Sequence, residues 1–312
     1  MNNREISSRI AAIKKDREHG AAQLAREAVR LLGEMAADPA IPDSRFGDLF
    51  LDVSRKLARA RPSMASLVNA VGTMMAAWKE AGAACDPRLS RLAIVEAARR
   101  WDERQEALVT FVADHAAEVV SGTVITLSHS STLLSVLESC WSRDVLKRVI
   151  VAESRPLFEG RRTADLLVGM GIPTLLVTDA ALGFFCSEAD VALVGADTIR
   201  PNGDLINKVG TLLLALVARH CRIPFYTVSE THKIAPAGRR RAPFALEEQD
   251  PKEILPKSIP GVVARNIYFD QTPARLLTGY ITERGLLNKR DIATLSRQMP
   301  GRFISPEYGS SF

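Results

Sequence analysis

Several polar side chains in this sequence follow short apolar runs directly, where they could hold an anion or move a proton. Ser128, His129 and Ser130 come after the run TVITL, and Arg155 comes after VIVAE. Asp197 ends the run VALVGAD. If these runs are parallel strands, their carboxyl ends are where ligands bind in open α/β sheets. These positions are therefore the first candidates for binding and catalysis.

Each residue type supports a chemical role and a simpler structural one. Hydroxyls and backbone N–H groups around Ser128 and Ser130 can hold an anion at a helix start, or they can cap the helix. The guanidinium of Arg155 can grip a phosphate or carboxylate with two prongs, or pair with Glu153. The carboxylate of Asp197 can act as an acid or base or hold a sugar hydroxyl, or it can cap a helix.

Further cations follow along the chain. The sequence predicts that Asn207 and Lys208 begin a helix, with Gly203 and Gly210 allowing close approach of the backbone, and Lys233 comes after IPFYTVSE. Three cations and several helix starts at one edge of a sheet indicate a phosphate-binding crevice.

The elements that must position these residues differ between the two parts of the chain. Up to about residue 117, apolar positions recur three and four residues apart, as in AAQLAREAVRLLGEMA, which predicts a helical part. From Gly122 onward, short apolar runs such as VLKRVIVAE alternate with helix-like stretches such as STLLSVLESC. This alternation predicts an α/β fold with a mainly parallel sheet covered on both faces.

Composition excludes several classes of protein. The chain has 312 residues, of which 46% are hydrophobic and 25% charged, as expected for a soluble globular protein with a large core. The four cysteines stand far apart without CxxC spacing, so neither a disulfide framework nor a zinc site is predicted, and a reducing cytoplasm fits best. No cofactor is indicated.

Two segments could suggest a membrane, and neither supports one. The N-terminus is too charged for a signal peptide, and Ile6, Ile10 and Ile13 recur at helical spacing, which predicts an amphipathic first helix. The apolar window 166–186 is interrupted by Pro173 and Asp179. Buried strands and their connections explain it better.

Net charge is a weak guide to partners. It is 41 − 36 = +5, a surplus that favours a phosphorylated ligand or a nucleic acid without choosing between them. The basic run GRRR lies in a predicted loop over 236–260, where a solvated turn is favoured over a phosphate or nucleic-acid patch. With 6% aromatic residues and no recognisable reading motif, direct nucleic-acid binding is disfavoured.

Longer motifs give the sequence a family resemblance. GADTIRPNGDLINKVGT, with RPSMAS before it and SETHK and FDQTPARLLTGYITERGLL after it, resembles the family of the alpha, beta and delta subunits of initiation factor 2B. That family also contains isomerases of methylthioribose-1-phosphate and ribose-1,5-bisphosphate. The resemblance implies a helical N-terminal domain, here 1–117, on a Rossmann-like domain, here 118–312, in a homodimer or larger homo-oligomer.

The resemblance also implies a ligand site between the two domains. Asp197 matches the position that the isomerases use as a catalytic acid or base, and Asp270 in FDQTP would line or support the site. The implied binding residues are Arg61, Ser63, Arg155, Asn207, Lys208 and Lys233.

Two departures bear on the activity. The isomerases have a catalytic cysteine where this chain has Ser128, whose hydroxyl is far less acidic than a thiol, so His129 would have to supply or assist the base. Cys140 and Cys186 are expected to be core residues. Glu159 stands where the isomerases usually have glutamine, and its carboxylate would repel a phosphate dianion or require another cation.

The sequence therefore predicts one of two functions. The first is a sugar-phosphate aldose–ketose isomerase in which Asp197, Ser128 and His129 are catalytic. The second is a non-catalytic relative of the initiation factor subunits that binds a nucleotide or a sugar phosphate.

Overall fold

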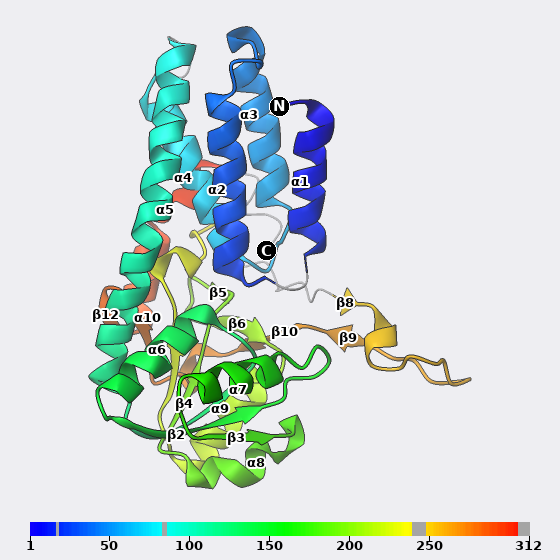
Figure 1. Ribbon diagram of the computed structural model, residues 1–312, viewed down its shortest axis with the longest axis vertical. Coiled ribbons are helices and arrows are strands. Elements are labelled where there is room, and N and C mark those ends of the chain that lie inside the picture. Colours follow the sequence, from blue (N-terminus) through cyan, green and yellow to red (C-terminus); the bar gives the residue numbers. More distant parts are fainter. Residues whose placement is uncertain (17–18, 83–85, 239–247, 305–312) are drawn as a thin grey trace.

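Five helices build the N-terminal part of the computed structural model, which describes residues 1–16, 19–82, 86–238 and 248–304 (Figure 1). They are α1 (Asn3–Lys15), α2 (Ala21–Ala37), α3 (Asp43–Ala58), α4 (Ala65–Glu80) and α5 (Pro87–Ala117). The first is amphipathic as predicted, since it buries Ile6 and Ile13, and Asn2 caps it by accepting from the backbone N–H of Glu5. Asp86 caps the long α5 in the same way.

A seven-stranded sheet follows, with the strand order β12-β11-β7-β4-β1-β2-β3. All neighbouring pairs are parallel except β11 and β12. The predicted α/β fold with a mainly parallel, Rossmann-like sheet is confirmed. The strands are β1 (Gly122–Leu127), β2 (Leu146–Ala152), β3 (Thr174–Val177), β4 (Val191–Val194), β7 (Phe225–Val228), β11 (Gly279–Thr282) and β12 (Gly285–Leu287).

Alternate side chains of the central strands enter two separate cores. Val124 of β1 packs in the core formed with α6 and the end of α5, whereas Ile125 packs in the core formed with α8 and α9. Burial on both faces explains why these strands are continuous apolar runs in the sequence. The covering helices are α6 (Ser131–Ser142), α7 (Glu159–Gly169), α8 (Leu182–Phe185), α9 (Thr211–Cys221) and α10 (Lys289–Ser296). Short 3₁₀ turns are η1 (Asp179–Ala181), η2 (Cys186–Glu188), η3 (Thr231–Lys233), η4 (Pro251–Glu253), η5 (Ala274–Leu276) and η6 (Pro300–Phe303).

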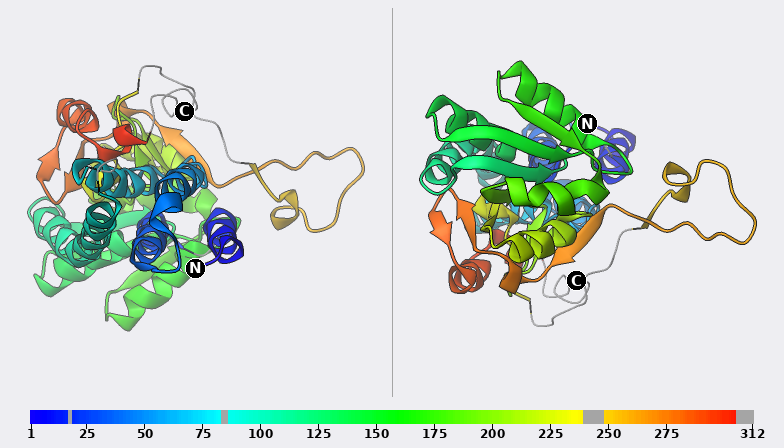
Figure 2. Two further views of the ribbon diagram at one scale, coloured as in Figure 1. Left: turned by 90° about the horizontal axis from the view of Figure 1, so that it is seen from above. Right: turned by 90° about the horizontal axis from the view of Figure 1, so that it is seen from below.

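A smaller antiparallel sheet contains β5 (Thr198–Ile199), β6 (Leu205–Lys208) and β10 (Phe269–Thr272). Asn207 and Lys208 lie on β6, so the prediction that they begin a helix is wrong; α9 starts at Thr211. The local sequence NKVGT suggested a helix start, but pairing with β10, about 60 residues away in the chain, makes this segment a strand. A third pair, β8 (Glu248–Gln249) and β9 (Asn266–Ile267), forms the base of an arm that projects from the body (Figure 2).

One buried amide connects the helical part to the sheet. Asn69 of α4 is fully buried, and its Nδ2 donates to the carbonyl oxygens of His232 and Ile234 at 2.8 and 2.7 Å. Its Oδ1 accepts from the backbone N–H of Gly301 at 3.0 Å. One turn further, an added methyl on Gly72 would lie 2.3 Å from the Pro300 carbonyl oxygen, so α4 and η6 are in close backbone contact. The last described residues of the C-terminal part therefore pack against the N-terminal helices.

Replacing this amide tests its importance. Asn69→Leu keeps the volume but leaves two buried carbonyls and one buried N–H without partners, which should lower the free energy of unfolding by about 3 kcal/mol or more. Urea denaturation measures the change. Thr73→Ala on the same helix is the control, because its hydroxyl bonds only the carbonyl of Asn69, and it should cost less than about 1 kcal/mol. Equal losses in the two variants would contradict the assigned role.

Candidate ligand site at the carboxyl ends of the strands

Strands β1 and β4 pair side by side at the centre of the sheet, and the strand order reverses between them. From β1 the chain adds β2 and β3 on one side, and from β4 it adds β7, β11 and β12 on the other. The turn after β1 holds Ser128 and Ser130, and the turn after β4 leads to Asp197. These turns touch, because an added methyl on Gly195 would lie 2.8 Å from the Ser130 hydroxyl oxygen. A position where strand order reverses leaves a crevice outside the strand ends, so the predicted residues flank the usual binding place of this architecture.

Hydrogen bonds fix the turns after β1, β2 and β3 to one another. The N–H of Ser128 donates to the Ser154 hydroxyl at 2.6 Å, and the N–H groups of Ser154 and Arg155 donate to the carboxylate of Asp179 at 2.9 and 2.7 Å. Ser128 and Ser154 both have left-handed backbone conformations, with φ of 65° and 64°. Such conformations cost energy in non-glycine residues and concentrate at functional sites.

Ser154 and Asp179 were missed by the sequence analysis as parts of this site. Asp179 does follow an apolar run, IPTLLVT, so the rule that identified Asp197 would also have found it. Ser154 carried no signal beyond its place next to Arg155.

Contacts of His129 define its tautomer. The Thr163 hydroxyl donates to the Ser128 carbonyl at 2.8 Å, so it must accept from Nδ1 of His129, which lies 3.1 Å away. This leaves Nε2 as the acceptor nitrogen. Burial, and then the charge of Arg162, lower the pKa of His129 below its ordinary value, so the ring is neutral at pH 7. The Ser128 hydroxyl has no hydrogen-bond partner within the described part of the chain.

Two hydrogen bonds connect Thr198, the residue after Asp197, to the start of α4 and to Ser63 just before it. The Thr198 hydroxyl donates to the carbonyl of Ser63 at 2.7 Å and accepts from the N–H of Ala65 at 2.7 Å. Arg61 is 8% exposed, and its Nη1 donates to the backbone carbonyl of Asp16 at 2.6 Å. The start of α4 is therefore held directly against the start of β5, next to Asp197.

Both predicted lysines lie close to carboxylates. Nζ of Lys208 donates to Oε1 of Glu159 at 2.6 Å, and Nζ of Lys233 lies 3.1 Å from Oε2 of Glu230. Each lysine is 4% exposed. Burial opposes ionisation of Glu230, but Lys233, His232 and the Thr132 hydroxyl outweigh it and lower the pKa of Glu230 to about 2.

Arg155 has no carboxylate partner of this kind in the described part of the chain, and Asn207 is a neutral residue with a hydroxyl partner. The Arg155 side chain is exposed, and its guanidinium lies 4.8 Å from the centre of the Phe158 ring. Asn207 is 7% exposed, and its Nδ2 donates to the Thr211 hydroxyl at 3.0 Å. Arg155 is thus available to an anionic ligand, whereas Asn207 also fixes the start of α9.

Asp270, which the family resemblance places at the site, caps α9. Its carboxylate accepts from the N–H groups of Gly210 and Leu212 at 2.8 and 3.2 Å, at the start of α9. Gly210 has φ of 103°, a conformation that favours glycine. Burial raises the pKa of Asp270 to about 6, although the two backbone hydrogen bonds act in the opposite direction.

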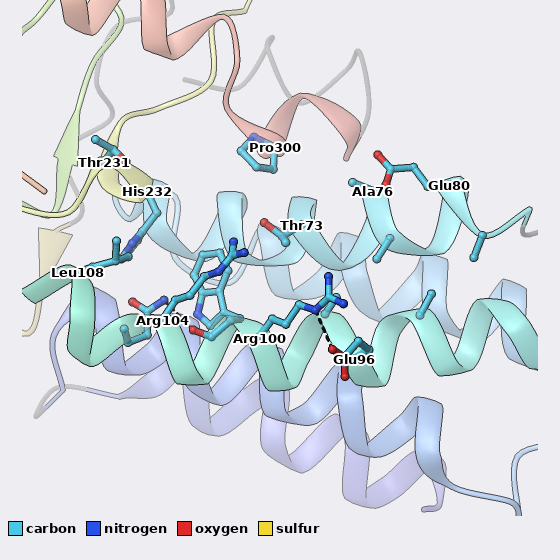
Figure 3. A pocket seen from close by; sticks show the side chains of 16 residues that line it. Thr73, Ala76, Glu80, Glu96, Arg100, Arg104, Leu108, Thr231, His232 and Pro300 are labelled. Atoms are coloured by element: carbon cyan, nitrogen blue, oxygen red, sulfur yellow. Dashed lines mark hydrogen bonds and ion pairs between the residues drawn. The ribbon is translucent and has the colours of Figure 1, made fainter. Parts of the chain in front are cut away.

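A separate groove of about 660 Å³ runs between α4 and α5 and ends at Thr231 and His232 (Figure 3). The residues predicted for the ligand site do not line it. Burial lowers the pKa of His232 to about 4, and its ring lies 5.4 Å from that of Trp101. Thr231 and His232, which line this groove, directly precede Lys233 in the chain.

Some expectations concern residues away from the site or features of the whole chain. Cys140 and Cys186 are core residues as predicted, with no exposed surface. Part of the GRRR run lies outside the described residues. Within the described ranges, no cluster of three or more His, Cys, Asp or Glu side chains could hold a metal ion. None of the helices in those ranges combines the length and apolarity needed to cross a bilayer.

Fold and site together define an α/β protein with a helical N-terminal part and with polar turns after the strands where the strand order reverses. Residues 17–289 match the Initiation factor 2 subunit family, and the chain belongs to that family.

Two relatives of this chain are named as sugar-phosphate isomerases, and one similar solved structure is named as an initiation factor. Ribose 1,5-bisphosphate isomerase of Archaeoglobus fulgidus is 32% identical over 289 residues, which cover 91% of this chain and 90% of that protein. Methylthioribose-1-phosphate isomerase of Thermus thermophilus is 31% identical over 260 residues, which cover 77% and 75%. The structure of Pyrococcus horikoshii translation initiation factor eIF-2B superposes with a TM-score of 0.80 at 31% identity, covering 94% of this chain and all of that one.

The cap at Asp270 gives a testable pH dependence. The pKa of the Asp270 carboxyl group is raised from 3.8 to about 6 on folding, so the folded state is favoured when this group is protonated. This contribution to stability is lost as the pH rises from about 4 to 6. Between pH 4 and pH 7, the free energy of unfolding of the wild type should fall relative to that of Asp270→Asn by about 2 kcal/mol. Chemical denaturation across this range measures it, with Asp291→Asn at the exposed cap of α10 as control. Parallel pH curves for wild type and Asp270→Asn would refute the assignment.

Proposed function

We propose that this protein is an aldose–ketose isomerase of a sugar phosphate, with Ser128 in place of the usual cysteine. The observation that carries the proposal is that a carboxylate, on Asp197, and a hydroxyl and an imidazole, on Ser128 and His129, follow the neighbouring strands β4 and β1 where the strand order reverses. The relatives named as isomerases of ribose 1,5-bisphosphate and methylthioribose-1-phosphate support it.

The base in this proposal is His129. Cys140 and Cys186 are poor substitutes, because burial raises the pKa of Cys140 to about 11 and that of Cys186 to about 12, so neither is a thiolate at pH 7. The neutral imidazole has its lone pair on Nε2, since Nδ1 donates to Thr163. A neutral base is what proton removal from carbon needs at this pH.

Proton transfers in this proposal occur between two carbons of the substrate. His129, acting directly or through the Ser128 hydroxyl, removes the proton from C2. Asp197 moves protons between C1 and the substrate oxygens, so that a C–H bond forms at C1 as the one at C2 breaks. Arg155, Lys208 and Lys233 hold the phosphate.

The helical part, 1–117 in our division of the chain, closes the site in this proposal. The segment from Arg61 to Ala70 covers one side of the crevice and excludes water from the sugar. The hydrogen bonds of Thr198 to Ser63 and Ala65 support this arrangement.

A ligand-binding regulator is the second candidate function, with a nucleotide or a sugar phosphate as ligand. It is favoured by the absence of a thiol from the turn after β1 and by the carboxylates beside both lysines. A regulator binds its ligand without exchanging protons, so thermal shift with sugar phosphates and nucleotides, combined with proton exchange, separates the two functions.

A homodimer or larger homo-oligomer is part of the proposal. The arm between β8 and β9 projects from the body and exposes Ile259, Val262 and Val263, by 52, 53 and 86% (Figure 2). Apolar side chains on a projecting segment suit burial against a second copy of the chain. Sedimentation equilibrium measures the assembly.

Asp197→Asn tests the isomerase. The amide cannot transfer protons, so exchange at C2 of ribose 1,5-bisphosphate or methylthioribose-1-phosphate in deuterated water, followed by NMR, should fall by about 10²-fold or more. Ligand binding should be largely kept. Wild-type activity in this variant would eliminate the proposed role, and a wild type that binds these sugars without exchange would favour the regulator.

His129→Ala and Ser128→Ala distinguish the two candidates for the base. Loss of the imidazole should reduce exchange by about 10²-fold or more, whereas loss of the hydroxyl should have a smaller effect, because a serine is a weak base at pH 7. The same NMR experiment measures both. A larger loss in Ser128→Ala would reverse the assignment.

A further inference from the structure

Glu159 lies beside Lys208, one of the two lysines predicted to bind phosphate. It begins α7, and its Oε1 accepts from Nζ of Lys208 at 2.6 Å. Lys208 comes from β6, a strand of the smaller sheet, and its side chain is nearly inaccessible to solvent. Its ammonium group therefore already has a counter-charge before any ligand arrives.

The second oxygen of the same carboxylate is unsatisfied. Oε2 of Glu159 is buried and has no hydrogen-bond partner in the described part of the chain. A carboxylate oxygen paired with an ammonium group can only accept hydrogen bonds. A buried acceptor without a partner costs free energy, and a hydrogen-bond donor on a ligand would recover it.

The other predicted lysine is compensated as well. Glu230 is 1% exposed, and its Oε2 lies 3.1 Å from Nζ of Lys233, so the two form a buried ion pair. Of the four cations predicted to bind phosphate, Arg61 and Arg155 have no carboxylate partner among the residues that the structure describes. This balance suits one phosphate group better than two, since a second dianion would meet the Glu159 carboxylate.

We infer that Glu159 determines ligand specificity: it accepts a hydrogen bond from a free hydroxyl of the bound sugar and disfavours a second phosphate. The ligand class is therefore a sugar monophosphate rather than a bisphosphate. The inference rests on the proposed sugar-phosphate site but not on turnover at that site.

Binding of a matched pair of sugars tests it. Isothermal titration at pH 7 and fixed salt compares ribose 1-phosphate, with a free hydroxyl at C5, with ribose 1,5-bisphosphate. The wild type should bind the monophosphate more tightly, and Glu159→Gln should shift the affinity ratio toward the bisphosphate by about tenfold, because it removes a negative charge from a partly buried site.

Glu153→Gln is the matched control. It removes a carboxylate from the segment just before α7, but Glu153 pairs with Arg161 at the surface and not with Lys208. This variant should keep the wild-type ratio, which separates the local effect of Glu159 from a change in net charge.

Each outcome has a distinct meaning. If neither sugar binds the wild type, the proposed sugar-phosphate site falls and the inference falls with it. If the wild type binds the bisphosphate as tightly as the monophosphate, or if Glu159→Gln leaves the ratio unchanged, the inference is overturned while the isomerase proposal survives. The wild-type comparison holds even if Glu159→Gln destabilises the fold.

Discussion

The buried polar contacts of α4 are the constraint on which the rest of the structure depends. Asn69 satisfies three backbone groups from η3, the residue after it and η6, while the first turn of α4 is bonded to Thr198. A buried amide with unmatched partners would be destabilising, so helix and sheet can meet in few relative positions. Because Thr198 adjoins Asp197 and Ile234 adjoins Lys233, these contacts also set the geometry of the site.

The electrostatics of the site follow from how deeply its cations are buried. A lysine ammonium that is 4% exposed would be costly to keep without a counter-charge, by several kcal/mol. Glu159 and Glu230 supply these charges and stabilise the site in the absence of ligand. The same carboxylates weaken attraction for a dianion, so stability without ligand and affinity for phosphate oppose each other. Arg155 is exposed and stacks on Phe158, and no carboxylate among the described residues pairs with its guanidinium.

Local patterns in the sequence predicted the elements that are local in the structure. Five apolar runs became β1, β2, β3, β4 and β7, and the rule that ligands bind after such strands selected Ser128, Arg155 and Asp197 as candidates. The structure of Asn207 and Lys208 could not be predicted in this way, because their strand exists through pairing with Phe269 and Asp270.

The partner of Glu159 illustrates the same limit. Its charge predicted that another cation would be required in a phosphate site, but the choice of Lys208 depends on a contact 49 residues away in the chain. The sequence thus predicts the need for compensation, and tertiary packing decides which residue provides it.

With a hydroxyl in place of a thiol, a different group must remove the proton from the substrate carbon in the proposed isomerase. A thiol with a reference pKa near 8.5 is partly ionised at neutral pH, whereas a serine hydroxyl is not. His129 has the opposite problem, since its lowered pKa keeps it neutral but makes it a weaker base. Its fixed tautomer, with Nδ1 bonded to Thr163, removes one unproductive state. A weak base transfers protons efficiently only if the developing negative charge on the substrate is stabilised. In the proposed isomerase, Asp197, by donating a proton, and the arginines would therefore carry more of that task than a thiolate base would require.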